Sequence, residues 1–405
     1  MKGLSWFIPE QRQHPPSLEA FAGSREDWWT WEQLSWSEQT VGELGSTEAG
    51  MGVVADGAGE LSFVVGREIR GEGSLEWHGP ADEQPDWSRM KVRPWYHAVF
   101  PDGSQWATPM GVFLTATPSA KHDSGWVTVP VDLYDKTLLL ARDRMDRVES
   151  LPAGTDAVAA IEAIVTASTG DTVNIDPGEH TLRSQMTWDQ GTSRLRQVND
   201  LLDAAGYFAL YADMMGAFTA DRYVRTEDRP VASRYVDGEG CTYADGFTIT
   251  ADDFDIPNKV IVNARPDETT DEVLTAVATV DEIFGTQHRL SFAQRGFWFV
   301  DPEVEEVEAT DQDALEVIAR RRLEAGLEVA TSLPLDHFPS PAALNDVVRF
   351  SYGPGGVNFL AVRQGLQVPT TSGAWWTSTI RRIASEDLAS ANLPQPDLPQ
   401  PVNFP

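Results

Sequence analysis

The stretch TPMGVFLTATPSAKHDSGWVTVPVDLYDKTLLL, residues 108–140, predicts two paired strands leading into a helix. MGVFLTAT (110–117) and GWVTVPVDLY (125–134) combine β-branched and aromatic residues, and KHDSG (121–125) between them is typical of a turn. ELSFVVGREI (60–69) and WYHAVF (95–100) have the same composition, and Pro101-Asp102-Gly103 forms the expected tip of a hairpin. Several short strands at this spacing predict a small barrel or sandwich in the first 150 residues.

The middle of the chain changes from a strand pattern to a helix pattern. We expect one helix to start at Thr155 and end at Gly170, and a second to run from the cap Ser193 to Gly206. Their apolar stripes are Val158, Ile161, Ile164 and Val165, and Leu195, Val198, Leu201 and Leu202. A hairpin that turns at Met214-Met215-Gly216 should follow.

Strands return from about residue 244, in GFTIT, KVIVNA, EVLTAVATV and the hairpin around GPGG (353–356). One helix interrupts them at 310–326, capped by Thr310 or Asp311 and ended by Gly326. Its triplet Arg320, Arg321 and Arg322 points in three directions on a helix, which indicates a solvated or ion-paired surface rather than a phosphate site. The segment NLPQPDLPQPVNFP (392–405) contains five prolines and predicts an extended arm.

The charge of the chain is strongly negative, with 62 Asp and Glu against 31 Lys and Arg, a net of −31. Such a surface repels nucleic-acid phosphates and anionic membranes, so neither is an expected binding partner. The excess of acid can serve solubility alone. The sharper hypothesis is a surface past which DNA moves without binding.

Several catalytic and targeting patterns are missing from the sequence. Cys241 is the single cysteine, which excludes an intramolecular disulfide, and we expect it to be a small, partly buried residue. The seven histidines form no metal-binding pair, and no phosphate loop, nucleophile elbow or zinc helix is present. MKGLSWFIPE does not have the pattern of a signal peptide, and no window has the roughly 20 apolar residues of a membrane helix. We therefore expect a soluble, non-enzymatic protein without cofactors, synthesised in the cytoplasm.

Two clusters leave alternatives open. Asp252, Asp253 and Asp255 precede the strand KVIVNA and form either a weak ion site or, as we favour, the polar start of a strand. Four tryptophans lie within nine residues, and such a run is hard to bury in one small domain. It predicts an interface segment, and the candidate interface residues are Trp28, Trp29, Trp31 and Trp36 together with Pro394, Pro396, Pro399 and Pro401.

The order of these elements resembles the phage tail hub (baseplate hub) family, whose members are also known as minor tail proteins. Residues 108–140 resemble the end of the first hub barrel, and GTSRLRQVNDLLDAAGYFALYADMMGAFTADRYVRTEDRPV resembles the helix and hairpin of the family. FDIPNKVIVNA is similar to the acidic turn that leads into a strand of the second barrel. ATDQDALEVIARRRLEAGLEVATSLPLDHFPSPAALNDVVRFSY resembles the late helix and its following strand. The resemblance covers about residues 60–385.

The resemblance implies an α+β, mainly β fold with two small β-barrel hub domains and helix-containing inserted domains. The expected divisions are 1–148 for the first barrel with the Trp-rich segment and 149–243 for the helices and hairpin. The second barrel with helix 310–326 should occupy 244–385, and the arm 386–405. The implied function is a structural one, as a homotrimer at the tail tip of a virion. It would join a hexameric distal tail ring to a trimeric tip and line the channel through which DNA is ejected. Implied partners are the distal tail protein, the tape-measure protein and receptor-binding or tip proteins.

A second hypothesis is a secreted or virion-borne protein that binds or hydrolyses cell-wall glycans, with exposed tryptophans stacking on sugar rings. It would need a pair of catalytic carboxylates, and the sequence singles out none among its many acids.

Overall fold

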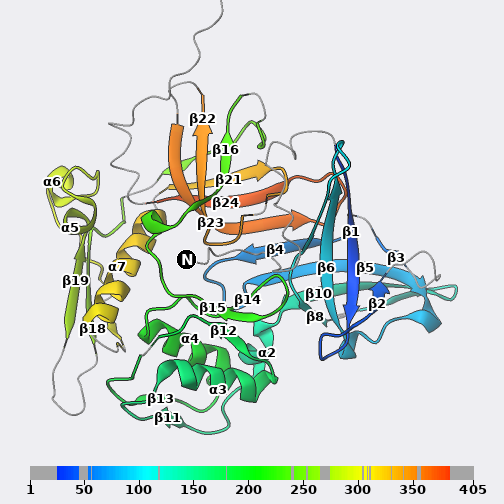
Figure 1. Cartoon of the computed structure of the whole chain (residues 1–405), viewed down its shortest axis with the longest axis horizontal. Coiled ribbons are helices and arrows are strands. Elements are labelled where there is room, and N and C mark those ends of the chain that lie inside the picture. The colour runs from blue at the N-terminus through cyan, green and yellow to red at the C-terminus, as the bar shows by residue number, and fades with distance from the viewer. Residues whose placement is uncertain are drawn as a thin grey trace, which may run out of the picture.

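A large mixed β-sheet organises the fold (Figure 1). The computed structural model describes residues 25–44, 53–55, 57–116, 119–178, 180–238, 241–251, 254–264, 274–302, 305–307, 309, 312–329, 331–340, 342–353 and 357–383. In this part of the chain the sheet has 16 strands, and its main path runs β17-β21-β24-β23-β4-β5-β10-β8-β6-β1-β2.

The first half of the large sheet comes from residues before 136. Its strands are β1 Glu26–Leu34, β2 Thr40–Leu44, β3 Val53–Val54, β4 Glu60–Val64, β5 Gly71–Pro80, β6 Lys91–Val99, β7 Gln105–Pro109, β8 Phe113–Ala116, β9 Lys121–Asp123 and β10 Trp126–Asp135. β10 alternates strictly, so that it buries Val127, Val129 and Val131 and turns the intervening residues outward. The predicted hairpin at Pro101–Gly103 is confirmed by the pairing of β6 with β7.

The second half comes from residues after 230. Its strands are β16 Val231–Val236, β17 Thr250–Ala251, β21 Thr331–His337, β22 Val347–Tyr352, β23 Val357–Pro369 and β24 Trp376–Arg382. β23 is long enough to pair with β22 and β24 and also with β4 of the first half. The two predicted barrels are therefore two halves of one continuous sheet. The mainly β, α+β fold is confirmed, but the barrels are not separate bodies because the β4–β23 pairing joins them.

The middle of the chain forms a helical unit below the large sheet in Figure 1. It contains α2 Thr137–Arg142, α3 Ala157–Thr169 and α4 Arg194–Ala204, with the short strands β11 Glu149–Leu151, β12 Val173–Ile175, β13 Met186–Trp188, β14 Tyr211–Ala212 and β15 Phe218–Ala220. Ser193 caps α4 as predicted, whereas Asp156 rather than Thr155 caps α3. Leu195, Val198, Leu201 and Leu202 are all buried in its core.

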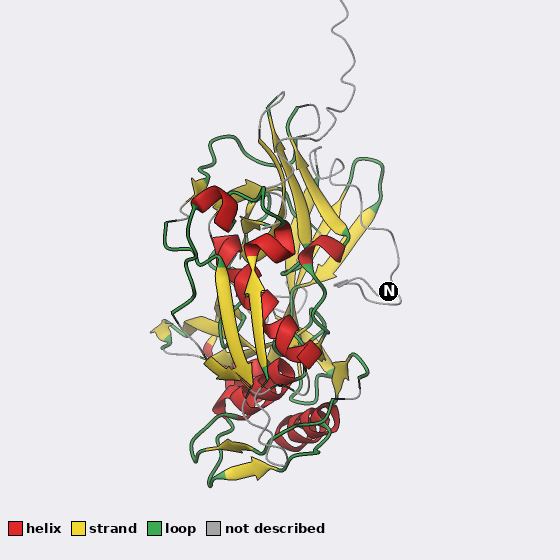
Figure 2. Ribbon diagram, turned by 90° about the vertical axis from the view of Figure 1, so that its left-hand side faces the viewer, coloured by secondary structure: helices red, strands yellow, loops and turns green. Residues whose placement is uncertain are grey.

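A small α/β unit is inserted between β17 and β21. It consists of β18 Lys259–Ala264, β19 Thr275–Thr279, α5 Val280–Phe284, α6 Phe292–Arg295, β20 Glu305–Val307 and α7 Gln312–Val329. Figure 2 shows strands of its sheet in front of the long helix α7. The apolar face of α7, with Leu315, Ile318 and Leu323, packs in the core of this unit.

The predictions for β18 and for the two ends of α7 had different outcomes. β18 pairs with β19 and β20 in a separate sheet, so the prediction that FDIPNKVIVNA enters a strand of the second barrel was wrong. α7 continues past Gly326 to Val329, because a glycine that keeps helical backbone angles does not end a helix. The proposed caps Thr310 and Asp311 lie outside the described residues.

Candidate functional site

The tryptophan-rich segment forms β1 and the turn after it, and the four predicted interface residues differ in how exposed they are. Trp31 is buried at 4% exposure, and Trp29 packs against the same core. Trp28 points outward with 41% exposure, and Trp36 in the β1–β2 turn is 54% exposed. Trp28 and Trp36 are thus accessible to a partner, whereas Trp31 fills the interior. The predicted proline contacts, at 394, 396, 399 and 401, lie outside the described residues.

Trp28 belongs to a compact cluster on the outer face of β1 and β6. Its ring stacks on His97 with centroids 5.1 Å apart and planes 4° apart. His97 Nε2 lies 2.9 Å from Thr30 Oγ1, and burial lowers the pKa of His97. The neutral imidazole therefore supports the Trp28 ring from behind and holds it in one orientation.

The same arrangement recurs on β5 and β10. Trp126 is 47% exposed and stacks on His78 at 5.1 Å and 15°, while His78 Nδ1 lies 2.9 Å from Thr128 Oγ1. In both places a strand carries Trp-x-Thr, and a histidine from the neighbouring strand contacts both side chains. Sequence reasoning did not single out Trp126, although the shared Trp-x-Thr spacing was a readable signal.

The turn after β1 is tied to buried lysines. Glu38 has a positive φ of 62°, and its Oε1 contacts Lys91 Nζ at 2.7 Å and Lys136 Nζ at 2.6 Å. Lys136 also pairs with Asp171 Oδ2 at 2.9 Å, and Lys91 lies over the Trp36 ring. These ion pairs compensate two lysines that are almost fully buried, and they anchor the exposed Trp36 turn to the helical unit.

One face of the large sheet is polar across both halves and acidic on the first half. On β21, β24, β23, β4, β5 and β10, the residues between the buried positions point away from the cores. The carboxylates at these outward positions are Glu60, Glu72, Glu76, Asp132 and Asp336. Arg381 is the single cation at the outward positions of the described parts of these six strands. The outward positions of these six strands therefore carry a net negative charge.

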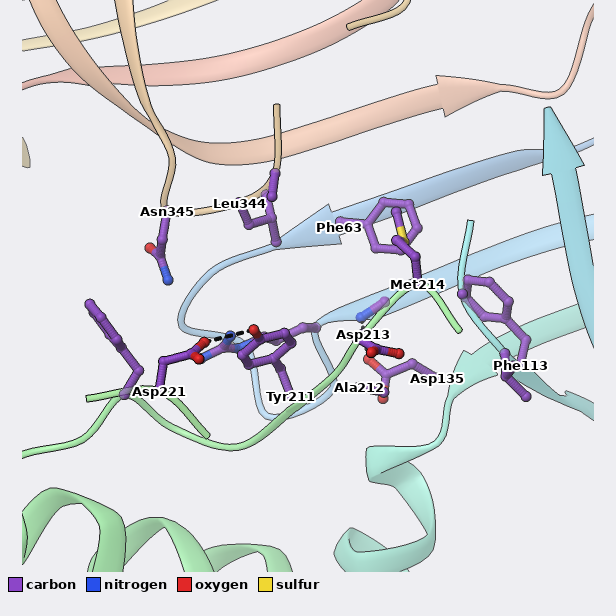
Figure 3. A pocket seen from close by; sticks show the side chains of 16 residues that line it. Phe63, Phe113, Asp135, Tyr211, Ala212, Asp213, Met214, Asp221, Leu344 and Asn345 are labelled. Carbon is purple, nitrogen blue, oxygen red and sulfur yellow. Dashed lines mark hydrogen bonds between the residues drawn. The ribbon is translucent and has the colours of Figure 1, made fainter. Parts of the chain in front are cut away.

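A cavity of about 80 Å³ lies where the two sheet halves meet the helical unit (Figure 3). Phe63, Phe113 and Met214 form its apolar side, and Asp135, Asp213 and Asp221 point toward it. Its volume holds a few water molecules.

The carboxylates of this cavity have structural partners. Asp135 accepts hydrogen bonds from Gly71 N at 2.5 Å and Thr137 N at 2.8 Å, and Asp213 accepts from Met215 N and Ala217 N. Tyr211 donates to Asp221 Oδ2 at 2.7 Å. Burial raises the pKa of all three carboxyl groups. Because backbone amides and a tyrosine hold them, these carboxylates stabilise the local backbone of the segments that line the cavity.

Cys241 and the aspartates before β18 are the remaining groups that the sequence singled out. Cys241 is partly buried, as expected, and its thiol donates to Tyr243 O at 3.3 Å. Asp255 is exposed, and Asp252 and Asp253 lie outside the described residues. Within the described ranges no group of three metal-binding side chains occurs, and no helix there is long and apolar enough to cross a membrane.

Two arginines of the α7 triplet form ion pairs, as predicted. Arg320 Nε contacts Glu324 at 2.7 Å within the helix. Arg321 pairs with Asp203 of α4 and donates to Tyr207 O at 2.9 Å. Arg321 therefore joins the small α/β unit to the helical unit.

Solved structures of phage tail proteins have the same overall fold. A tail protein from Neisseria meningitidis MC58 superposes with a TM-score of 0.58 over 91% of this chain and 100% of its own, at 9% identity. The chain has the fold of phage tail proteins. The 43 kDa tail protein of prophage MuSo2 from Shewanella oneidensis gives 0.56, with 89% and 99% coverage and 11% identity. The prophage tail protein gp18 from Listeria monocytogenes EGD-e gives 0.51, with 89% and 97% coverage and 12% identity.

Sequence comparison adds nothing to this likeness. No family model matches the chain, and no curated protein matches it either. The superpositions on solved tail proteins confirm, at the level of the fold, the resemblance inferred from the order of elements.

Proposed function

We propose that this protein is a non-enzymatic structural component of a phage tail tip, a homotrimeric hub that joins the hexameric distal tail ring to the trimeric tip. The observation that carries the proposal is a fold shared with tail proteins over about nine-tenths of the chain. The continuous sheet supports it, because two sheet halves per chain give a trimer six similar units around its axis. The proposed partners are the distal tail protein, the tape-measure protein and tip proteins that contact the host.

The domain divisions of the proposal follow the sequence prediction. We assign residues 1–148 to the first hub domain and 149–243 to a middle domain that contains the helical unit and ends with β16 of the large sheet. Residues 244–385 are assigned to the second hub domain and 386–405 to the arm. The exposed Trp28 and Trp36 are candidate contacts to a neighbouring subunit, since exposed aromatic side chains contribute strongly to protein interfaces.

The acidic sheet face is our candidate for the wall of the DNA channel. Glu60, Glu76 and Asp132 offer DNA phosphates no cation to bind, and Arg67 beside Glu72 is already paired with it at 3.1 Å, so that the genome would pass without binding.

The oligomeric state tests the trimer directly. Light scattering after gel filtration, at two protein concentrations, should give about 134 kDa, three times the 44.6 kDa of one chain. A dimer or a tetramer would contradict the proposal. A monomer at both concentrations that stays monomeric when mixed with purified distal tail protein would contradict it too.

Charge reversal tests the channel wall separately. Virions that carry Glu60→Lys, Glu72→Lys, Glu76→Lys and Asp132→Lys together should assemble but eject DNA at least ten times more slowly in low salt, because each new cation can bind a phosphate. The matched control reverses four exposed carboxylates elsewhere, Asp82, Glu83, Glu162 and Asp189. Equal ejection rates for the two variants would rule out this face as the channel wall.

A further inference from the structure

The outer end of the small α/β unit carries an exposed group of large aromatic side chains. We call it the aromatic cap and define it as Phe254, Phe292, Phe297 and Trp298. Their exposed fractions are 82%, 42%, 52% and 40%, respectively. In Figure 1 the helix α6 of this unit lies at the opposite side of the molecule from β1 and β5. Exposed aromatic groups of this kind mark interaction sites in soluble proteins.

Phe292, Phe297 and Trp298 of the cap are held in place by neighbouring side chains. Phe292 and Trp298 are in contact, with centroids 5.1 Å apart, and Lys259 Nζ lies 5.7 Å from the Trp298 ring. The Arg295 guanidinium lies over the Phe297 ring at 5.1 Å.

Arg295 also joins the two loops that carry the cap. Its Nη1 donates to Ile256 O at 2.6 Å and its Nη2 to Phe254 O at 3.0 Å. The backbone that carries Phe254 is therefore fixed beside the rings of residues 292–298, and preorganisation lowers the entropy cost of binding.

The chemistry of the cap fits a polyproline-type segment. Such segments have no internal hydrogen bonds, arrive already extended, and bind by laying proline rings against aromatic side chains. The chain itself carries a proline-rich segment, with the repeat Leu-Pro-Gln-Pro at 393–396 and again at 398–401. This segment contains one carboxylate, Asp397, and no lysine or arginine. Lys259 and Arg295, which lie against rings of the cap, can pair with that carboxylate.

The segment leaves the described chain next to the unit that carries the cap. The described chain ends at Ile383, directly after β24. β24 contacts α7, and α7 packs on β18 and β19 of the unit that carries the cap. The ten residues from Ile383 to Leu393 span up to about 33 Å when extended.

We propose that the aromatic cap is the docking site for the proline-rich segment 392–405 of this protein, from the same copy or from a neighbouring one. This inference does not depend on the hub function. The aromatic cap was not among the predicted interface residues, whereas Pro394, Pro396, Pro399 and Pro401 were. The proposal gives these prolines a binding site.

Site-specific photo-crosslinking in the full-length chain tests the proposal. p-Benzoylphenylalanine in place of Phe297 changes an exposed ring and leaves the Arg295 hydrogen bonds intact. Trypsin cleaves after Arg382 and at no later position, so residues 383–405 form a single peptide. We expect this peptide to be the main product crosslinked to position 297. A product with the mass of one chain identifies the same copy as its source, and a product of two chains identifies a neighbour.

Two further variants make the test specific. Replacing Pro394, Pro396, Pro399 and Pro401 with serine should reduce the crosslink at least fivefold without changing the circular dichroism spectrum. The same crosslinker in place of the equally exposed Trp126 should not capture this peptide. Crosslinks from position 297 to another part of the protein, no crosslink, or an unchanged yield in the serine variant would overturn the proposal.

Discussion

The cores of the two sheet halves are built from different side chains. The main cluster of the first half packs aromatic and aliphatic groups around Trp77, Tyr96 and Phe113, while its buried lysines pair with Glu38. The second half encloses His337 and Arg363, both with 0% exposure, next to Tyr235 and Phe350. The two halves share one sheet, so the difference shows that strand pairing does not dictate what a core contains.

The polar groups of the second core are held by hydrogen bonds. His337 Nδ1 donates to Phe338 O at 2.5 Å, which leaves Nε2 to accept from Ser378 Oγ at 2.7 Å. Arg363 donates to Ala342 O and Tyr235 Oη, and to Ser340 Oγ at 3.3 Å. Burial, with the Arg363 charge nearby, lowers the pKa of His337 to about 3. Burial also raises the pKa of Asp346, close to Arg363, to about 6. The second core should therefore respond to pH through His337 and Asp346, whereas Trp77 in the first core carries no group that titrates in this range.

Trp77→Ala should have the largest effect on stability and should not depend on pH. Trp77 is fully buried, and removing a buried aromatic side chain costs about 4 kcal/mol. Urea unfolding at pH 5 and pH 8 should give the same loss at both values. A loss that differs between the two pH values by more than about 1 kcal/mol would remove the contrast between the cores.

Asp346→Asn should stabilise the protein at neutral pH. The folded pKa of about 6 lies above the ordinary 3.8, so the stability of the native protein falls as pH rises from about 4 to 6. The variant keeps an oxygen for Ala343 N and avoids burying the charge, a gain of up to about 3 kcal/mol at pH 7. Urea unfolding at pH 4 and pH 7 measures it, and an equal effect of the substitution at both values would contradict the assignment.

His337→Gln should change the response to acid in the opposite sense. The folded pKa of about 3 lies below the ordinary 6.5, so the native protein loses stability as pH falls below 6.5. The loss is about 1.4 kcal/mol per pH unit, or about 2 kcal/mol at pH 5. The free energy of unfolding, measured by urea from pH 5 to 7, should depend less steeply on pH in the variant, because about one fewer proton is taken up on unfolding. An unchanged slope would show that His337 is not the group responsible.

Trp28→Ala should have the smallest effect on the stability of the single chain, below about 1 kcal/mol, because the side chain is already partly exposed. Its effect should instead appear in assembly, as a lower trimer fraction by light scattering. His122→Ala, at another exposed position of the first half, serves as the control. Equal trimer fractions for both variants would remove Trp28 from the proposed interface.

Much of the fold could be predicted from local patterns. Alternation in β10, the helical stripe of α4 and the Pro101–Gly103 tip are encoded within windows of a few residues, so the sequence reveals them. The assignment of β18 failed because the sheet that a strand joins depends on partners far away in the chain. The predicted end of α7 at Gly326 failed for a related reason, since packing of α7 outweighs the weak helix propensity of one glycine.

For the candidate surfaces, the sequence alone determined the composition: an excess of acid, a tryptophan-rich strand and a proline-rich segment. Only the tertiary structure decided which of these groups are accessible. Strand alternation turned Trp28 outward and Trp31 inward, and the β4–β23 pairing aligned carboxylates from both halves on one face. The aromatic cap joins residues about 40 positions apart through Arg295, and His337 meets Ser378 across a strand pair. Contacts between distant segments arise only when the whole chain folds, because burial and hydrogen bonding are shared among elements that are far apart in sequence.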